Sequence, residues 1–282
     1  MERDKIIIYT PDRFLQIGFL NQWREMFLSL FLSRELIWRL FLRDFSAKYK
    51  QTLFGVLWAV LNPIIVVGVF VFLNKSGILN IGETTVPYSV YALIGISIYS
   101  LFSTGLSVTA NSIIGAGSMV VKINFPKISL VISSFGQALV EFAIRIVLFA
   151  VVFVIFGVTP KWTMVLLPLA IIPIILFTLG IGFFLSLLTG IFRDTPHITS
   201  LFTSFLLFLT PALYPPPKSG VFVILNAWNP LSHLIMGCRD TILVGGISNV
   251  SGFLWSSIFA IILFFASWRI FYLAETRIAE RI

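Results

Sequence analysis

The residues best able to do chemistry in this 282-residue sequence are two charged side chains within a long apolar run. Glu141 and Arg145 are the charged residues of the segment from Ile128 to Phe156. Their spacing of four puts both side chains on one face of a helix, where they can neutralise each other. An unpaired charge at the centre of a membrane helix costs roughly 2.5–3.5 kcal/mol, so we expect the two to pair.

Such a pair has two possible roles. It can be a proton relay or gate element facing a cavity, or a structural ion pair that fixes helix packing, within one chain or between protomers. Proton-driven carriers usually scatter several such groups over their helices, whereas this chain has one pair.

Motifs for enzymatic chemistry are absent from the sequence. No Gly-Lys dipeptide occurs, which excludes a phosphate-binding G-x-x-x-x-G-K-[ST] loop, and neither H-E-x-x-H nor G-x-S-x-G is present. The single Cys238 and the distant His197 and His233 indicate no disulfide and no local metal motif. We therefore expect no catalysis and no cofactor on this chain, and the energy for any work must come from a partner or a gradient.

The composition is that of a membrane protein. Hydrophobic residues make up 58% of the chain and charged residues 11%, against about 25% charged in soluble domains. Apolar runs of about 20 residues can cross a bilayer as helices. We predict an all-α integral membrane protein with spans at about 54–73, 88–110, 133–156, 164–191, 198–214 and 252–273. Pro168 and Pro173 predict a kink in the fourth span, and the Ser and Thr content of the second predicts a packed or cavity-facing helix.

The positive charges predict how the chain is oriented. With both termini in the cytoplasm, fifteen Lys and Arg residues lie on the inner side and four on the outer side, as the positive-inside rule requires. The net charge of +8 then reflects basic loops near anionic lipids rather than nucleic-acid binding. This topology divides the chain into a cytoplasmic segment 1–50, a membrane domain 51–273 and a cytoplasmic tail 274–282, in the inner membrane.

The segment from Arg34 to Tyr49 predicts an amphipathic helix in the cytoplasmic interface. Apolar residues recur every fourth position and basic residues gather opposite them: Ile37, Phe41, Phe45 and Tyr49 against Arg39, Arg43 and Lys50. Such a helix can serve as an anchor and topology signal, or as a docking surface for a cytoplasmic partner.

The outer connection 215–251 opens with three prolines and is too apolar for a solvated loop. A re-entrant or interfacial pair of half-helices would suit it, because irregular backbone is tolerated where protein or a cavity surrounds it. A surface segment folded against the protein is the alternative. Among the aromatic residues, which mostly face lipid or pack, Tyr88, Tyr91, Tyr99 and Phe102 in the second span are the candidates for lining a pore.

Several short sequences resemble the ABC-2 type permeases that export O-antigen, capsule and teichoic-acid polysaccharides. The run from Arg43 to Trp58 resembles the opening of those proteins, although Lys48 stands where the family usually has arginine and lacks its forked hydrogen bonding. Further pieces agree in order along the chain: Asn62-Pro63, Phe125-Pro126, Arg193-Asp194, Pro211 with Tyr214, and Asn229-Pro230-Leu231 followed by Arg239.

The resemblance implies a homodimer around a channel, with two copies of a separate ATPase subunit that binds ATP and Mg²⁺. It implies three functional regions on this chain. The inner entrance for a lipid diphosphate would hold Arg39, Arg43, Lys48 and Tyr49. The coupling loop to the ATPase would hold Asn124, Phe125 and Lys127, and the outer gate Pro211, Tyr214, Asn229, Pro230 and Arg239.

The leading hypothesis is therefore the membrane subunit of an exporter for a lipid-linked polysaccharide. An ABC-2 permease for a drug or small lipid is an alternative within the same family. A gradient-driven carrier using Glu141, or a membrane enzyme acting on a polyprenyl lipid, would belong to different classes of protein.

Overall fold

A computed structural model shows the fold, and its described residues form helices joined by turns and loops, with no strand among them. The prediction of an all-α protein is confirmed. The described ranges are 18–50, 52–78, 81–117, 119–123, 125–192, 194–217 and 219–278.

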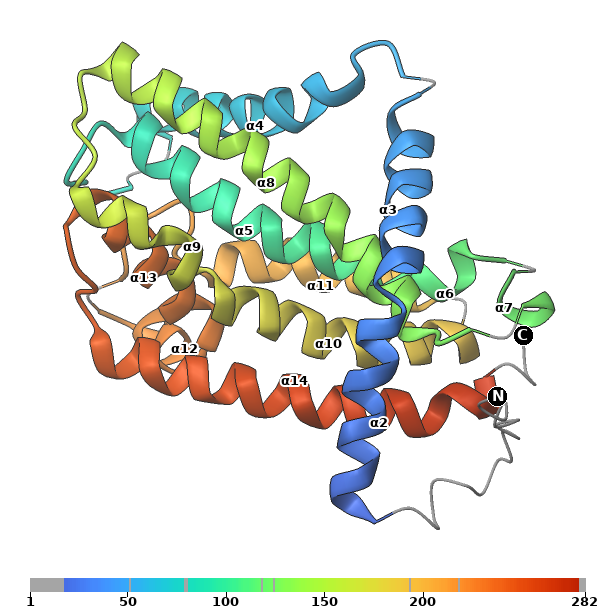
Figure 1. The fold of residues 1–282 in the computed structure, drawn as a ribbon. Coiled ribbons are helices and arrows are strands. Elements are labelled where there is room, and N and C mark those ends of the chain that lie inside the picture. Colours follow the sequence, from blue (N-terminus) through green and yellow to red (C-terminus); the bar gives the residue numbers. More distant parts are fainter. Residues whose placement is uncertain are drawn as a thin grey trace, which may run out of the picture.

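Five helical stretches are long and apolar enough to cross a membrane within the described ranges. They lie alongside one another, with α5 between α8 and α10, and α14 against α10 (Figure 1). The stretches are Gly55–Lys75, which joins η1 (Gly55–Leu57) to α4 (Trp58–Lys75); α5 (Tyr88–Ala110); α8 (Ile128–Phe156); Trp162–Ile191; and Val250–Glu275 within α14 (Val250–Ile278).

The fourth stretch is interrupted where the prolines predicted a kink. It consists of η2 (Trp162–Leu166), α9 (Leu167–Ala170) and α10 (Ile172–Ile191), with a break at Ile171. Pro168 and Pro173 occupy the first turns of α9 and α10. A proline there removes only a backbone N–H that would have no partner within the helix, so each proline begins a helix instead of breaking one.

The predicted span 198–214 is a shorter helix than expected. Helix α11 (Thr195–Leu209) has 15 residues, about 22 Å at 1.5 Å per residue, whereas the hydrocarbon core is about 30 Å thick. It ends before Thr210, which is extended because a residue before proline avoids the helical conformation. Since α10 ends at the end of the bundle that carries α3 and α12 lies at the opposite end, α11 and the turn after it run back from one end to the other (Figure 1).

The segment after α11 contains the predicted pair of half-helices. Helices α12 (Val221–Trp228) and α13 (Pro230–Leu243) meet at 83°, and both lie at the end opposite α3 (Figure 1). Asn229 separates them with an extended backbone, and its side chain accepts a hydrogen bond from the Leu231 N–H. An asparagine cap followed by proline at the first helical position is a strong helix start.

Two helices cross the other end of the bundle, α2 (Phe19–Leu32) and α3 (Arg34–Tyr49) (Figure 1). Helix α3 has the predicted boundaries, whereas α2 was not predicted. Helix α2 docks on α14 through aromatic rings, with Phe27 and Trp23 lying 4.8 and 6.0 Å from Trp268 between ring centroids. The short α6 (Ser112–Gly115) and α7 (Met119–Lys122) lie at the same end (Figure 1).

Helix α5 is the central helix of the bundle. Tyr91, Tyr99 and Phe102 are buried in the core, the Tyr99 hydroxyl donates to the Thr203 carbonyl of α11, and Phe102 stacks on Phe177 of α10. The hydroxyl of Tyr88 is also buried. Of the suggested pore-lining residues, Tyr99 and Phe102 therefore pack inside the chain in this conformation, whereas Tyr91, although buried, also forms part of the wall of a cavity at the start of α5. Most of the second span is packed, as the first of the two alternatives expected.

Candidate functional site

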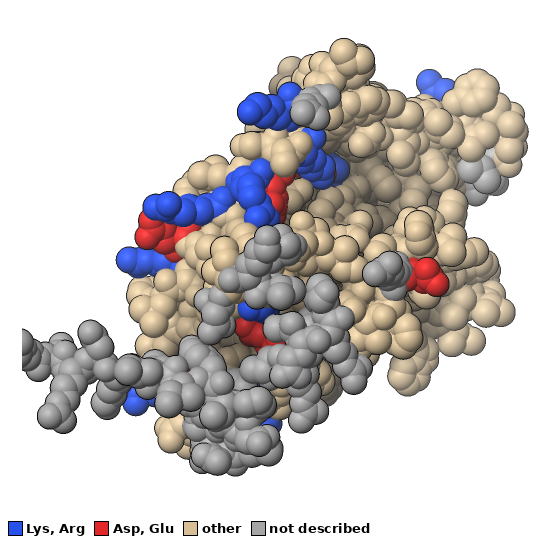
Figure 2. All heavy atoms as spheres, turned by 90° about the vertical axis from the view of Figure 1, so that its right-hand side faces the viewer, with Lys and Arg blue, Asp and Glu red and all other residues tan. Residues whose placement is uncertain are grey.

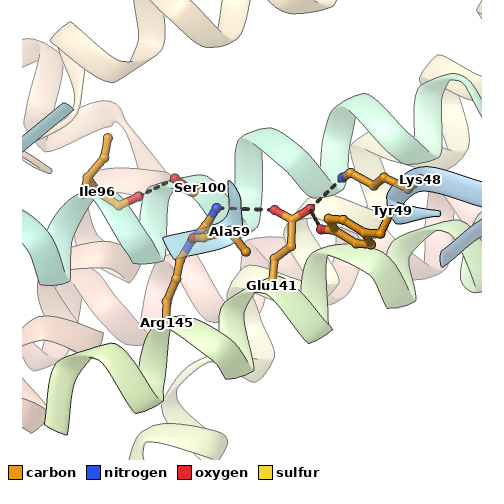
Figure 3. A network of polar contacts seen from close by, with 7 residues as sticks. All are labelled: Lys48, Tyr49, Ala59, Ile96, Ser100, Glu141 and Arg145. Atoms are coloured by element: carbon orange, nitrogen blue, oxygen red, sulfur yellow. Dashed lines mark hydrogen bonds and ion pairs between the residues drawn. The ribbon is translucent and has the colours of Figure 1, made fainter. Parts of the chain in front are cut away.

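A cluster of charges surrounds Glu141 where α3 crosses α8 (Figure 3). One carboxylate oxygen, Oε1, lies 2.6 Å from Lys48 Nζ and accepts a hydrogen bond of 3.0 Å from the Tyr49 hydroxyl. The other oxygen, Oε2, lies 3.3 Å from Arg145 Nη2. The pairing expected from the spacing of Glu141 and Arg145 is present, and two residues 92 and 93 positions away complete it.

Arg145 extends the cluster to a third helix. Its Nε donates a hydrogen bond of 3.3 Å to the carbonyl of Ala59 in α4, and its buried Nη1 has no hydrogen-bond partner. We call Lys48, Tyr49, Glu141 and Arg145 the charge cluster. It joins α3 to α8 and α4.

Exposure decreases across the charge cluster. The side chain of Lys48 is 37% exposed, whereas that of Arg145 is 4% exposed. Burial and the nearby Glu141 carboxylate raise the pKa of Tyr49 above its usual value, because both disfavour the phenolate. Tyr49 therefore remains protonated and can donate its hydrogen to Glu141.

A glycine allows α3 to approach α8 closely enough for these contacts. A Cβ atom on Gly136 would lie 2.7 Å from Cδ2 of Phe41, closer than two carbon atoms can approach without strain. Phe41 belongs to a ladder of aromatic rings along α3, with neighbouring centroids 5.0–5.7 Å apart: Trp38, Phe41, Phe45 and Tyr49. The apolar face predicted from the sequence thus packs on the bundle and positions Lys48 and Tyr49.

The basic side chains of α3 form part of the end of the molecule shown in Figure 2. Arg39 and Arg43 are exposed, and each lies beside an acidic residue of α3: Arg39 Nη2 is 2.6 Å from Glu35 and Arg43 Nη2 is 2.7 Å from Asp44. The four suggested entrance residues therefore divide into two pairs. Arg39 and Arg43 face solvent, whereas Lys48 and Tyr49 bind Glu141.

The suggested coupling loop is partly buried. Asn124 lies outside the described residues. Lys127 is 5% exposed, its backbone N–H donates to Glu275 of α14 at 2.6 Å, and its ammonium lies 4.8 Å from the centroid of the Phe125 ring. Lys127 thus ties the loop to α14, and its ammonium donates to the Phe125 carbonyl at 3.2 Å. Ile114 of α6 and Ile123, which follows α7, have exposed apolar side chains.

The suggested gate residues meet at the end opposite α3. Arg239 is 3% exposed, donates to the Pro211 carbonyl at 2.9 Å, and has its guanidinium carbon 3.9 Å from the centroid of the Tyr91 ring. Asn229 donates to the Thr210 hydroxyl at 3.0 Å, and the Tyr214 hydroxyl donates to the Phe208 carbonyl at 2.6 Å. Pro230 begins α13. These contacts hold the chain after α11 against α13 and α5.

The link between Lys48 and Glu141 was missed because the two residues were assigned to different sites. One signal in the sequence was available: a carboxylate within an apolar helix needs compensation. Glu141 had one cation at helical spacing, and the basic residues just before the first span were a second possible source.

Residues 35–243 match the family described as ABC-2 type transporter. The chain is similar to proteins named O-antigen export system permease protein RfbA. One, from Klebsiella pneumoniae, is 26% identical over 208 residues, covering 72% of this chain and 78% of that protein. Another, from Myxococcus xanthus, is 29% identical over 188 residues, covering 66% of this chain and 71% of that protein. The family match extends from α3 through the charge cluster to the end of α13, and the chain belongs to the ABC-2 type transporter family.

Proposed function

We propose that this chain is the membrane permease subunit of an ATP-driven exporter for a lipid-linked polysaccharide of the O-antigen type. The observation that carries the proposal is the similarity, over about two thirds or more of both chains, to permeases named for O-antigen export. The exposed arginines of α3 add a surface that suits an anionic lipid diphosphate, because arginine forms strong, paired hydrogen bonds with phosphate.

The working assembly contains two copies of this chain and two copies of a separate ATPase subunit, which binds ATP and Mg²⁺. It lies in the inner membrane with both termini in the cytoplasm. The end that carries α3 is then the inner end, in keeping with the positive-inside rule. The half-helices α12 and α13 form the outer gate.

The charge cluster gives this assembly a means of transmitting movement. The ATPase would press on the inner end, where Ile114 and Ile123 are exposed. Glu141 of α8 binds Lys48 of α3 and also Arg145, which donates a hydrogen bond to α4. A movement of α3 would therefore pull α8 and α4 with it. Glu141 is buried and accepts hydrogen bonds from three side chains, which favours a structural role over that of a proton carrier.

Co-purification tests the proposed function. The chain is expressed with the P-loop ATPase encoded by a neighbouring gene, and ATP hydrolysis of the complex in lipid is measured with and without lipid-linked glycan. We expect a stable complex whose hydrolysis responds to the glycan. If the two proteins do not associate, the function is wrong and a gradient-driven carrier becomes the better assignment.

Neutralising the exposed arginines is expected to weaken the response to the substrate. Each basic residue near an anionic lipid headgroup contributes about 1 kcal/mol, and Glu35 and Asp44 offset part of that charge. For Arg39→Gln/Arg43→Gln we expect the lipid-linked glycan concentration that gives half-maximal stimulation of hydrolysis to rise about tenfold, as a net loss of about 1.4 kcal/mol implies.

Lys75→Gln is the matched control, since this exposed cation ends α4 at the opposite end of the bundle. It should leave the stimulation unchanged. If the double arginine variant responds to the glycan as the unchanged protein does, α3 does not form the substrate entrance.

A further inference from the structure

A cavity of about 220 Å³ lies at the end opposite α3 and is partly open to the outside of the protein. Its wall combines the loop before α5, the first turns of α5, the prolines after α11 and the C-terminal half of α13. The side chains that matter for the argument are Glu83, Tyr91, Pro215, Met236, Arg239 and Asp240. The proposed function assigns no role to this cavity.

The polar side chains of the cavity are held in place by contacts within the chain, but they can form further hydrogen bonds. Arg239 has five N–H groups, of which one is bound to the Pro211 carbonyl, and its guanidinium lies over the Tyr91 ring. Asp240 Oδ2 accepts the Ser248 N–H at 3.0 Å, and Glu83 is exposed. Among the described residues, no ion pair joins Arg239 to either carboxylate. The guanidinium can therefore still donate hydrogen bonds to a ligand, and the carboxylates can still accept them.

The mixture of charges argues against a ligand with a strong charge of one sign. A phosphate or other anion would meet Glu83 and Asp240 as well as Arg239, and a cation attracted by the two carboxylates would still meet the guanidinium. The described residues hold no group of three metal-ligating side chains. An apolar ligand would cover these polar groups without bonding to them, and each unsatisfied group costs about 1–3 kcal/mol.

A neutral ring carrying several hydroxyl groups satisfies the same wall. Its hydroxyl hydrogens can be donated to the carboxylates, its oxygens can accept from the guanidinium, and its C–H face can lie on Pro215 and Met236. The cavity is smaller than the roughly 300–1,000 Å³ of sites for drug-sized ligands, which suits one ring rather than several.

We propose that this cavity is a subsite for one neutral sugar ring, occupied by successive units of the glycan as it leaves the transporter. The assignment rests on the proposed function, because the supply of sugar at this end depends on export. Binding at the subsite is weak, since a polymer that moves along a path must be released as readily as it is held, as ions are in channels.

Saturation-transfer NMR on the full-length chain in lipid nanodiscs tests the subsite without the ATPase. The probes are the methyl glycosides of glucose, galactose and mannose. We expect saturation transfer to at least one of them, and a signal at least threefold weaker in Asp240→Asn and in Glu83→Gln. Asp194→Asn, an exposed carboxylate at the start of α11, should match the unchanged protein.

Two results would overturn the subsite: saturation transfer no greater than that of empty nanodiscs for all three probes, or equal signals in the unchanged protein and both cavity variants. A stronger signal from glucuronate or glucosamine than from the neutral glycosides would show that the subsite prefers a charged sugar to a neutral one. Failure of the proposed function is distinguished by the co-purification experiment. If the chain binds these sugars but does not associate with an ATPase, the sugar-binding site stands and the assignment as an ATP-driven exporter is wrong.

Discussion

Replacing Glu141 by glutamine is expected to lower the free energy of unfolding by about 3 kcal/mol or more. The change removes the carboxylate that Lys48, Tyr49 and Arg145 share, and Arg145 is buried too deeply to reach water. Breaking a buried ion pair by removing one partner typically costs about 3–5 kcal/mol, because an uncompensated charge remains. Thermal unfolding of the purified chain, followed by size-exclusion chromatography, measures the loss.

Related variants separate the contributions of the two cations. Lys48→Gln should cost less than Glu141→Gln, since the Lys48 side chain is partly exposed. Glu141→Gln/Arg145→Gln should be more stable than Glu141→Gln alone, because the buried charge is removed with its partner. If Glu141→Gln is as stable as the unchanged protein and transport loses its dependence on pH, Glu141 is a proton relay and the structural role is wrong.

Replacing Gly95 by alanine is expected to prevent correct folding. A Cβ atom at Gly95 would meet the backbone of Ala212, with 2.8 Å to its carbonyl carbon and a still closer approach to the carbonyl oxygen. A backbone group cannot rotate away as a side chain can, and Ala212 lies in a buried turn. Overpacking a core usually costs about 1–3 kcal/mol, and a clash between backbones should exceed that range.

The measurement for Gly95→Ala is the yield of monodisperse protein after extraction, which we expect to fall at least tenfold. Gly68→Ala provides the matched control, since Gly68 is also helical and nothing lies within 4 Å of its added Cβ. Alanine favours a helix more than glycine does, so this control should fold normally. A normal yield for Gly95→Ala would show that the turn after α11 lies further from α5.

The sequence by itself determined the features that depend on neighbouring residues. The length of an apolar run predicts a spanning helix, a four-residue period predicts the packed face of α3, and the prolines mark where α9 and α10 begin. The pairing of Glu141 with Arg145 belongs to the same class, because helix geometry brings residues four apart together wherever the helix lies. The bend between α12 and α13 was predictable from the prolines and apolar pieces around Asn229.

Only the tertiary structure decided which of these elements meet. It brought Lys48 and Tyr49 to Glu141, Tyr91 to Arg239, and the unpredicted helix α2 to α14. It also placed Phe102 inside the bundle, although its aromatic ring would suit a channel wall equally well. Such contacts arise when whole helices pack at particular angles and depths, and residues so far apart in the sequence leave no local period from which that packing could be predicted.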